Sequence, residues 1–165
     1  MSRAFVKEAD DNLPSDELPE RPQSPHPNYV TPGGLAQLHA RVHALQEERD
    51  RLAAQDDPMA RTHLLAVKRD LRYFQGRVER AILVDPAGQA RDEVRFGAEV
   101  EIEDATGTRV AYRIVGEDEA EVNAGRISWA SPLGKALIGL RVGDSFSWQR
   151  AGNAQDVAVV EIRYA

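Results

Sequence analysis

Two stretches of sequence decide the fold, LAQLHARVHALQEERDRL at residues 35–52 and LLAVKRDLRYFQGRVERA at residues 64–81. In both, apolar residues recur at alternating three- and four-residue steps, which places them on one face of an α-helix. The first series is Leu35, Leu38, Val42, Leu45 and Leu52, and the second is Leu64, Val67, Leu71, Phe74, Val78 and Ala81. Arg49 fills the slot that interrupts the first series. Two such seams joined by a short polar break predict an antiparallel helical hairpin, a two-stranded coiled coil.

Two cap-then-proline pairs predict where these helices begin. Thr31-Pro32 and Asp57-Pro58 each place an oxygen-bearing cap before a proline at the first helical position. We therefore expect the first helix over residues 32–54 and the second over residues 58–83. Gly76 lies inside the second helical pattern and predicts a close approach of the first helix near the base of the hairpin.

The break between the helices reads Gln55-Asp56-Asp57-Pro58 and places two adjacent carboxylates at the tip. Asp57 has a structural explanation, because it caps the second helix. Asp56 has no such role, and two neighbouring carboxylates repel each other and attract a divalent cation. Because Mg²⁺ prefers about six oxygens in octahedral geometry, this pair could only complete a site that a partner supplies.

From Glu93 onward the apolar period changes from that of a helix to the period of two that is typical of strands. Ser131-Pro132 predicts the start of one short helix that runs to Ile138. The expected strands lie at residues 94–103, 109–115, 125–129, 142–149 and 157–162. These elements predict a small domain with a mostly antiparallel sheet and one short helix, so the fold class is α+β.

The chain of 165 residues thus divides into four parts. Residues 1–28 are expected to form a disordered Pro-rich acidic tail, since they hold five prolines and little apolar surface. Residues 29–84 are the hairpin, residues 85–92 a linker, and residues 93–165 the sheet domain.

Composition excludes several classes of protein. The absence of cysteine excludes disulfides and thiolate metal sites. No apolar run approaches the roughly 20 residues of a membrane span, and the N-terminus lacks a signal-peptide core, so we expect a cytoplasmic protein without membrane contact. The net charge is −6 and no basic stripe is present, which favours a protein partner over naked nucleic acid.

A long ordered string of residues resembles the C-terminal domain of the bacterial Gre transcript-cleavage factors. The string consists of Phe96-Gly97-Ala98, Tyr112-Arg113-Ile114-Val115-Gly116-Glu117-Asp118-Glu119-Ala120, Gly125-Arg126-Ile127-Ser128, Ser131-Pro132-Leu133-Gly134-Lys135-Ala136-Leu137-Ile138-Gly139 and Val142-Gly143-Asp144. Tyr29-Val30-Thr31-Pro32-Gly33-Gly34-Leu35 is similar to the start of that family's coiled coil. The resemblance covers residues 29–165.

The resemblance implies an FKBP-like C-terminal domain that docks on RNA polymerase and a coiled coil that enters the secondary channel. Asp56 and Asp57 would then be the tip residues, sharing Mg²⁺ with the polymerase active site during cleavage of backtracked RNA. Ser131, Pro132 and Leu133 would form the polymerase-binding loop. The protein itself would not be an enzyme and would have no cofactor of its own. It would be a monomer that meets nucleic acid only within the transcription complex.

The tip departs from the family pattern, which is Gly-Asp-Leu-x-Glu-Asn-Ala-Glu-Tyr. Here Gln55, Asp56, Asp57, Pro58, Met59 and Ala60 take its place, and no glutamate follows either aspartate by three residues. Each arm of the hairpin is also about one helical turn, or about 5 Å, shorter than the usual form.

Three functions therefore stay open. The first is stimulation of RNA cleavage, and the second is regulation or inhibition of polymerase by occupying the channel without cleavage. The third is a peptidyl-prolyl isomerase of the FKBP type, which needs a concave aromatic pocket. Against this third function, five aromatic residues mostly fall at positions that face the predicted core: Phe96, Tyr112, Trp129, Phe146 and Trp148.

Overall fold

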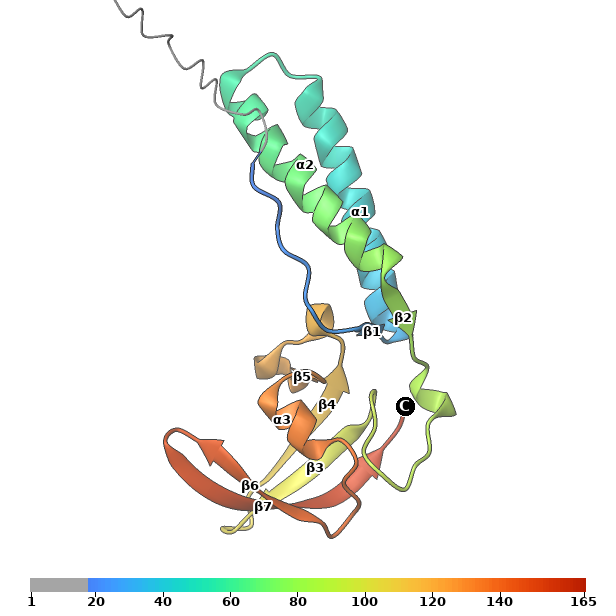
Figure 1. The fold of residues 1–165 in the computed structure, drawn as a ribbon, viewed down its shortest axis with the longest axis vertical. Coiled ribbons are helices and arrows are strands. Elements are labelled where there is room, and N and C mark those ends of the chain that lie inside the picture. Colours follow the sequence, from blue (N-terminus) through green and yellow to red (C-terminus); the bar gives the residue numbers. More distant parts are fainter. Residues whose placement is uncertain (1–17) are drawn as a thin grey trace, which may run out of the picture.

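The computed structural model describes residues 18–165, and Figure 1 shows a long helical hairpin standing on a small sheet domain. The first 17 residues of the predicted tail lie outside this described part. Helices α1 (Pro32–Ala53) and α2 (Pro58–Glu79) have 22 residues each. At 1.5 Å per residue, each is about 33 Å long. Within residues 18–165, no helix is both long and apolar enough to cross a lipid bilayer.

The predicted caps and the predicted seam both hold the hairpin together. The Thr31 hydroxyl accepts a hydrogen bond from the Gly34 amide at 3.0 Å, and the Asp57 carboxylate accepts one from the Ala60 amide at 3.1 Å. The apolar series faces inward: Leu38, Leu45, Leu52, Val67 and Leu71 are buried, with Val42, Leu64 and Phe74 packed against them. The helical hairpin expected from the periodicity is confirmed.

The end of α2 differs from the prediction, because the helix stops at Glu79 rather than at residue 83. Strand β2 (Ala81–Leu83) follows and pairs in parallel with β1 (Asn28–Val30), with Tyr29 opposite Ile82. The prediction of helix over these residues is wrong, since an unpaired strand edge from residues about fifty positions earlier satisfies their backbone groups instead.

The C-terminal part is a five-stranded curled sheet with α3 (Pro132–Leu137) in its hollow (Figure 1). Its strand order is β5-β4-β3-β7-β6, formed by β3 (Glu99–Asp104), β4 (Arg109–Val115), β5 (Arg126–Ser128), β6 (Ser145–Arg150) and β7 (Asn153–Arg163). All pairs are antiparallel except β4 with β5, so the sheet is mixed rather than antiparallel throughout. The α+β class is confirmed. Between hairpin and sheet lies a connection with one short 3-10 turn, η1 (Pro86–Gly88).

The core of the sheet domain comes from residues that alternate along the strands. Val100 and Ile102 of β3, Ile114 of β4 and Val159 of β7 are buried against Leu137 of α3. This packing explains why the period of two appears in the sequence, because one face of each strand meets α3 and the other meets solvent.

The segment before β1 also differs from the expectation of a disordered tail up to residue 28. Residues 18–27, called the strap below, run along α2 without forming a helix or strand (Figure 1). Glu20 forms an ion pair with Arg72, and Arg21 forms one with Asp70. The disorder prediction depended on the small apolar surface of the segment, and composition does not reveal these charged contacts.

Candidate functional site

The two predicted carboxylates at the tip of the hairpin are both exposed but have different partners. Asp57 is the N-cap of α2, as expected, and uses Oδ2 to accept the Ala60 amide. Asp56 has a side chain that is 93% exposed and forms an ion pair with Arg61. An ion pair in such a position contributes only about 0–1 kcal/mol, so Asp56 can exchange Arg61 for another cation at little cost.

These two residues fit Mg²⁺ only as part of a larger set of ligands. Within residues 18–165, no group of three or more Asp, Glu, His or Cys side chains is arranged to hold a metal ion. Two carboxylates supply fewer oxygens than the six that Mg²⁺ prefers, and Asp57 already uses one oxygen as a cap. The tip could therefore only add ligands to a metal site that a partner supplies, and Asp56 is the more available of the two carboxylates.

The structure separates the three residues of the predicted polymerase-binding loop. Ser131 caps α3, where its hydroxyl accepts the Gly134 amide at 3.1 Å and donates to the Ser128 carbonyl at 2.6 Å. Pro132 is exposed at the start of α3. Leu133 is only 8% exposed and belongs to the core cluster. A partner can therefore reach Pro132 directly, whereas Leu133 holds the helix on the sheet.

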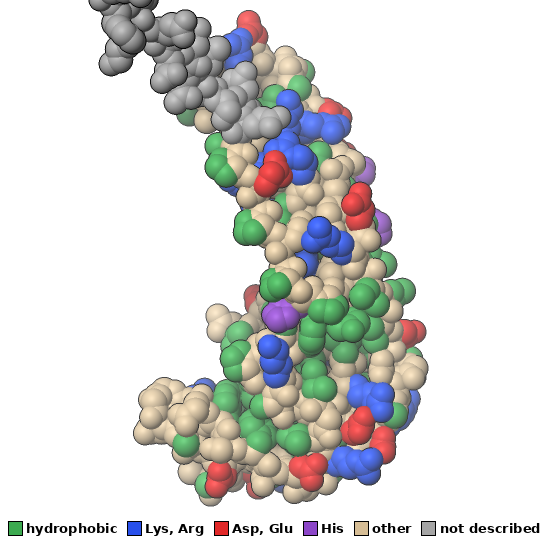
Figure 2. Space-filling model, in the orientation of Figure 1, with side chains coloured by type: hydrophobic (Ala, Val, Ile, Leu, Met, Phe, Trp, Pro, Cys, Tyr) green, Lys and Arg blue, Asp and Glu red, His purple; other side chains and the backbone are tan. Residues whose placement is uncertain are grey.

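The two candidate regions lie at opposite ends of the molecule, with the tip loop at the far end of the hairpin and α3 inside the sheet domain (Figure 1). They do not form a single site. Any function that uses both depends on the joint where the base of the hairpin meets the sheet domain. Figure 2 shows hydrophobic side chains around this joint, where β2 exposes Ile82 and Leu83.

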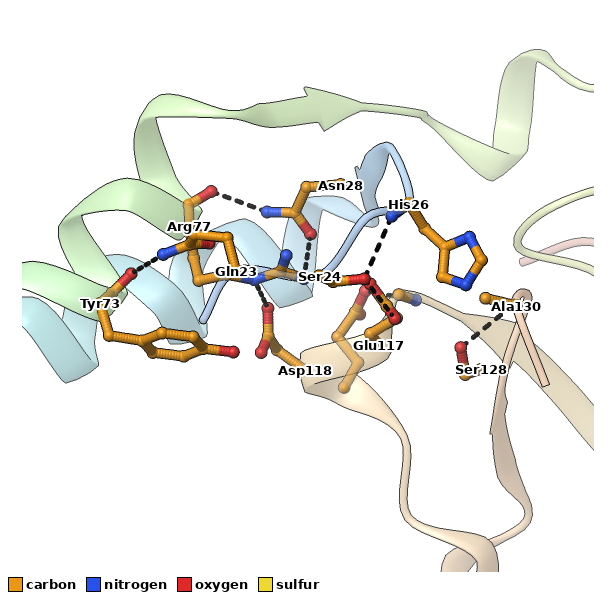
Figure 3. A network of polar contacts seen from close by, with 12 residues as sticks. Gln23, Ser24, His26, Asn28, Tyr73, Arg77, Glu117, Asp118, Ser128 and Ala130 are labelled. Carbon is orange, nitrogen blue, oxygen red and sulfur yellow. Dashed lines mark hydrogen bonds and ion pairs between the residues drawn. The ribbon is translucent and has the colours of Figure 1, made fainter. Parts of the chain in front are cut away.

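Arg77 of α2 is the centre of the joint, and no motif in the sequence singles it out. Its side chain is 2% exposed and lies among polar groups from three segments (Figure 3). Nε donates to Asp118 Oδ2 at 2.7 Å, and Nη2 donates to Asn28 Oδ1 at 2.6 Å and lies 3.5 Å from Glu117 Oε2. Asn28 donates in return to the Arg77 carbonyl at 2.7 Å. A buried guanidinium with these partners ties α2 to β1 and to the sheet domain.

Glu119 forms the second tie across the joint. Its Oε2 accepts the Thr31 amide at 3.1 Å and the Gly116 amide at 3.0 Å, and its Oε1 accepts the Thr31 hydroxyl. A carboxylate from the sheet domain thus sits at the N-terminus of α1, where the helix dipole favours negative charge. Gly34 makes room for it, because a Cβ there would lie 2.1 Å from the Glu119 carboxyl carbon.

A weak sequence signal for this joint existed. Glu117, Asp118 and Glu119 are three consecutive acidic residues. Neighbouring carboxylates repel one another, so cations from other parts of the chain are expected near them. Arg77 lies next to the apolar face of the second helical segment, where a charged side chain would be buried and would need a partner. Neither signal indicates its partner, because Arg77 and the three acidic residues are 40 or more positions apart in the sequence.

Most of the aromatic residues that the sequence singles out pack into the core of the described sheet domain. Tyr112 is buried, and Trp129, Phe146 and Trp148 pack against the core cluster, as predicted. Phe96 instead lies near the ring of Tyr29, with ring centroids 6.0 Å apart. The cavity that Trp148 lines has a volume of about 20 Å³. One ordered water needs roughly 10–15 Å³ of such space, so this cavity has room for about one water and is too small for a prolyl ring.

The chain, with its helical hairpin and small sheet domain, is similar in sequence to proteins of a known family. A sequence model described as "Transcription elongation factor, GreA/GreB, C-term" matches residues 89–164. Transcription elongation factor GreA of Rhodospirillum rubrum is 34% identical over 155 residues, covering 82% of this chain and 96% of that protein. GreA of Trichlorobacter lovleyi is 41% identical over 95 residues, which is 57% of this chain and 60% of that one. The chain belongs to the GreA/GreB family of transcription elongation factors.

Solved structures of this family also resemble the chain. A GreA/GreB elongation factor from Nitrosomonas europaea superimposes with a TM-score of 0.43 at 20% identity, covering 84% of this chain and 99% of that one. GreA factor homolog 1 of Thermus thermophilus superimposes with a TM-score of 0.39 at 24% identity, with the same coverage. At these scores the superpositions are too loose to support any statement about the geometry of a site.

Proposed function

We propose that this chain binds RNA polymerase, inserts its hairpin into the secondary channel and promotes cleavage of backtracked RNA by the polymerase active site. Membership in the GreA/GreB family supports polymerase as the partner. The observation that carries the proposal is the position of Asp56, whose exposed carboxylate stands at the end of a two-helix lever about 33 Å long.

In this proposal the tip supplies ligands and the polymerase performs the chemistry. Mg²⁺, when shared with the polymerase, would stabilise the attacking and leaving oxygens of phosphodiester hydrolysis. Asp56 would exchange Arg61 for the metal at little cost, because their ion pair is exposed. Asp57 would contribute through the oxygen that the helix cap does not use.

Docking would use the exposed start of α3. Pro132 offers a rigid apolar surface there, and Leu133 beneath it fixes the helix in the core. Lys135 and Ala136 are exposed on the same short helix and extend this surface.

A second candidate is a regulator that occupies the channel without stimulating cleavage. One observation favours it: both tip carboxylates already have partners within the chain, since Asp57 caps α2 and Asp56 pairs with Arg61. In that case the length of the hairpin would matter and the charge of its tip would not.

The test is RNA release from a stalled, backtracked elongation complex, with polymerase binding measured in parallel. The variant is Asp56→Asn/Asp57→Asn, because Asn keeps the helix cap while removing both charges. The matched control is Arg61→Ala, which frees Asp56 from its ion pair. We expect the wild type and Arg61→Ala to accelerate cleavage, and the double variant to bind equally well without accelerating it.

Other outcomes decide between the candidates. Binding that slows elongation, with or without the two carboxylates, would support the channel-occupying regulator and contradict cleavage. A wild-type chain that does not bind polymerase at all would contradict both.

A further inference from the structure

The strap, residues 18–27, crosses the joint between hairpin and sheet domain. Its first half is fixed to α2: Arg21 Nη1 lies 3.2 Å from Asp70 Oδ1, and its guanidinium stacks 4.0 Å from the centroid of the Tyr73 ring. Gln23 Nε2 donates to the Tyr73 carbonyl at 2.9 Å (Figure 3). Arg72 also donates to Glu20 at 2.8 Å, which holds the pKa of that carboxyl below its usual range. The Glu20 contact is therefore charged throughout the neutral range.

The second half of the strap is fixed to the sheet domain instead. The Ser24 hydroxyl donates to Glu117 Oε1 at 2.9 Å and accepts the His26 amide at 3.2 Å (Figure 3). The His26 ring meets Trp129 edge-on, with centroids 5.7 Å apart. The chain then enters β1, where Asn28 completes the shell around Arg77. One short segment thus binds both parts of the molecule and, through the Ser24 contact, also binds Glu117, which lies 3.5 Å from Arg77.

The sequence suits this path. Gly76 of α2 lets the strap approach, because a Cβ there would lie 2.8 Å from Gln23 Nε2. The close approach that this glycine predicted is therefore made by the strap, not by α1. Four prolines fix the backbone angles of the strap and of the residues before them, which lowers the entropy lost on binding: Pro19, Pro22, Pro25 and Pro27.

The other side of the joint is open. A cleft of about 400 Å³ lies between the first turn of α1 and the sheet domain, and no residue of the strap lines it. Its lining includes Gly33, Pro86 and Ala165, together with Thr31 and Glu119, whose hydrogen bonds cross the joint there. Figure 1 shows the strap on the opposite side of the hairpin from η1 and the C-terminus. A tilt of the hairpin into this cleft would pull α2 away from the strap, so the strap contacts would oppose it.

We propose that the strap is a positioning element that fixes the direction in which the hairpin leaves the sheet domain, with Arg77 as the positioning residue through which it acts. The consequence for the tip is large, because a rotation of about 10° at the base moves the end of a lever of about 33 Å by about 6 Å. The effect on cleavage rests on the proposed function, whereas the fixed direction itself does not.

The direction can be measured without polymerase. The chain has no cysteine, so spin labels attached through Met59→Cys at the tip and Thr106→Cys in the sheet domain report one distance by pulsed electron paramagnetic resonance. In the full chain, the strap variant Arg21→Ala/Gln23→Ala/Ser24→Ala removes the contacts on both sides of the joint. We expect its distance distribution to become about twice as wide as that of the wild type.

The matched control is Gln149→Ala/Asn153→Ala/Gln155→Ala, three exposed polar residues at the far end of β6 and β7, which should leave the distribution narrow. Ser24→Thr keeps the hydroxyl and should restore the narrow distribution when Ser24→Ala alone broadens it. If circular dichroism shows that the strap variant is folded and its distance distribution is as narrow as that of the wild type, the proposal is overturned. If the triple variant unfolds, the Ser24→Ala and Ser24→Thr pair decides the question in the same way.

The cleavage assay supplies the second readout. With the strap variant, we expect the maximal cleavage rate to fall about tenfold, because the tip is misplaced, while the half-saturating concentration stays unchanged. A wild-type chain without cleavage activity would contradict the proposed function and leave the distance measurement as the test of the strap. An unchanged maximal rate alongside a broadened distribution would show that the tip does not need this fixed direction.

Discussion

At the scale of single residues, the joint depends on Arg77 more than on any exposed charge. Its guanidinium is buried beside Asn28 and Asp118, so removal leaves buried polar groups without their cation. We expect Arg77→Met to lower the free energy of unfolding by about 3–5 kcal/mol, as measured by chemical denaturation. Arg77→Lys should show a large part of the same loss of stability, because one ammonium group cannot reproduce the forked contacts of the guanidinium.

Arg80, one turn further along and exposed, is the control for the charge alone. Arg80→Ala should change the free energy of unfolding by less than about 0.5 kcal/mol, as is usual for surface substitutions. Equal effects of the two substitutions would mean that the network in Figure 3 contributes little to stability.

Tyr164 gives a prediction about pH. Its hydroxyl donates to the Glu93 carbonyl at 2.6 Å and accepts the Arg95 amide at 2.9 Å, which closes the end of the chain onto the start of the sheet domain. Burial raises the pKa of the Tyr164 hydroxyl above its usual value of 10.0. The neutral form is therefore favoured by folding, and its contribution is complete below about pH 10 and is lost as the pH rises through the folded-state pKa.

We expect Tyr164→Phe to lower the free energy of unfolding by about 0.5–1.5 kcal/mol at neutral pH, because two hydrogen bonds are lost. The difference between wild type and variant, measured by chemical denaturation from pH 7 to 11, should shrink above about pH 10. A difference that stays constant up to pH 11 would contradict this assignment. Comparing the two proteins cancels the titration of the other tyrosines and of the lysines.

At the scale of elements, two neighbouring residues of α3 allow its role in folding to be separated from the docking role proposed for it. Leu133→Asp would place a carboxylate in the core, so we expect the sheet domain to lose several kcal/mol or to unfold. Pro132→Ala changes an exposed position and should leave the thermal unfolding midpoint nearly unchanged while weakening polymerase binding. Weaker binding by Leu133→Asp alone would report unfolding, and wild-type binding by Pro132→Ala would contradict docking at this helix.

The elements that the sequence predicted well are those whose causes are local. The caps at Thr31 and Asp57 and the seams of α1 and α2 depend on residues three or four apart, so periodicity was enough to find them. The end of α2 was missed because β2 pairs with β1, whose residues lie about fifty positions earlier. The strap was missed for a related reason, since its ion pairs with Asp70 and Arg72 are invisible to composition.

The candidate site was predictable to a similar extent. Sequence placed Asp57 as a cap and Asp56 as an exposed carboxylate, and both positions are as expected. It could not reveal that Leu133 turns inward while Pro132 stays outside, because that depends on how α3 packs against the sheet. The joint around Arg77 requires three segments at once, and no single stretch of sequence carries that information.

At the scale of the whole molecule, the proposed function, with a working tip at one end and docking at the other, needs a defined angle between the two parts. Besides the strap and Arg77, close contacts at the base of α1 are candidates for fixing that angle, because Glu119 reaches the helix N-terminus over Gly34 there. The neighbouring Gly33 lies in the same turn but has room for a side chain, because a Cβ there would lie 3.8 Å from its nearest neighbour, the Thr31 hydroxyl oxygen. These two glycines therefore form a matched pair for testing the joint.

We expect Gly34→Ala to lower the free energy of unfolding by about 1–3 kcal/mol, because its Cβ would displace the Glu119 carboxylate. The same substitution should broaden the distance between spin labels at the tip and in the sheet domain. Gly33→Ala should instead be neutral or stabilise the chain by up to about 1 kcal/mol, since it restricts the unfolded backbone and meets no obstacle. If both substitutions behave alike in both measurements, Glu119 does not fix the angle, and the direction of the hairpin must be set by Arg77 and the strap alone.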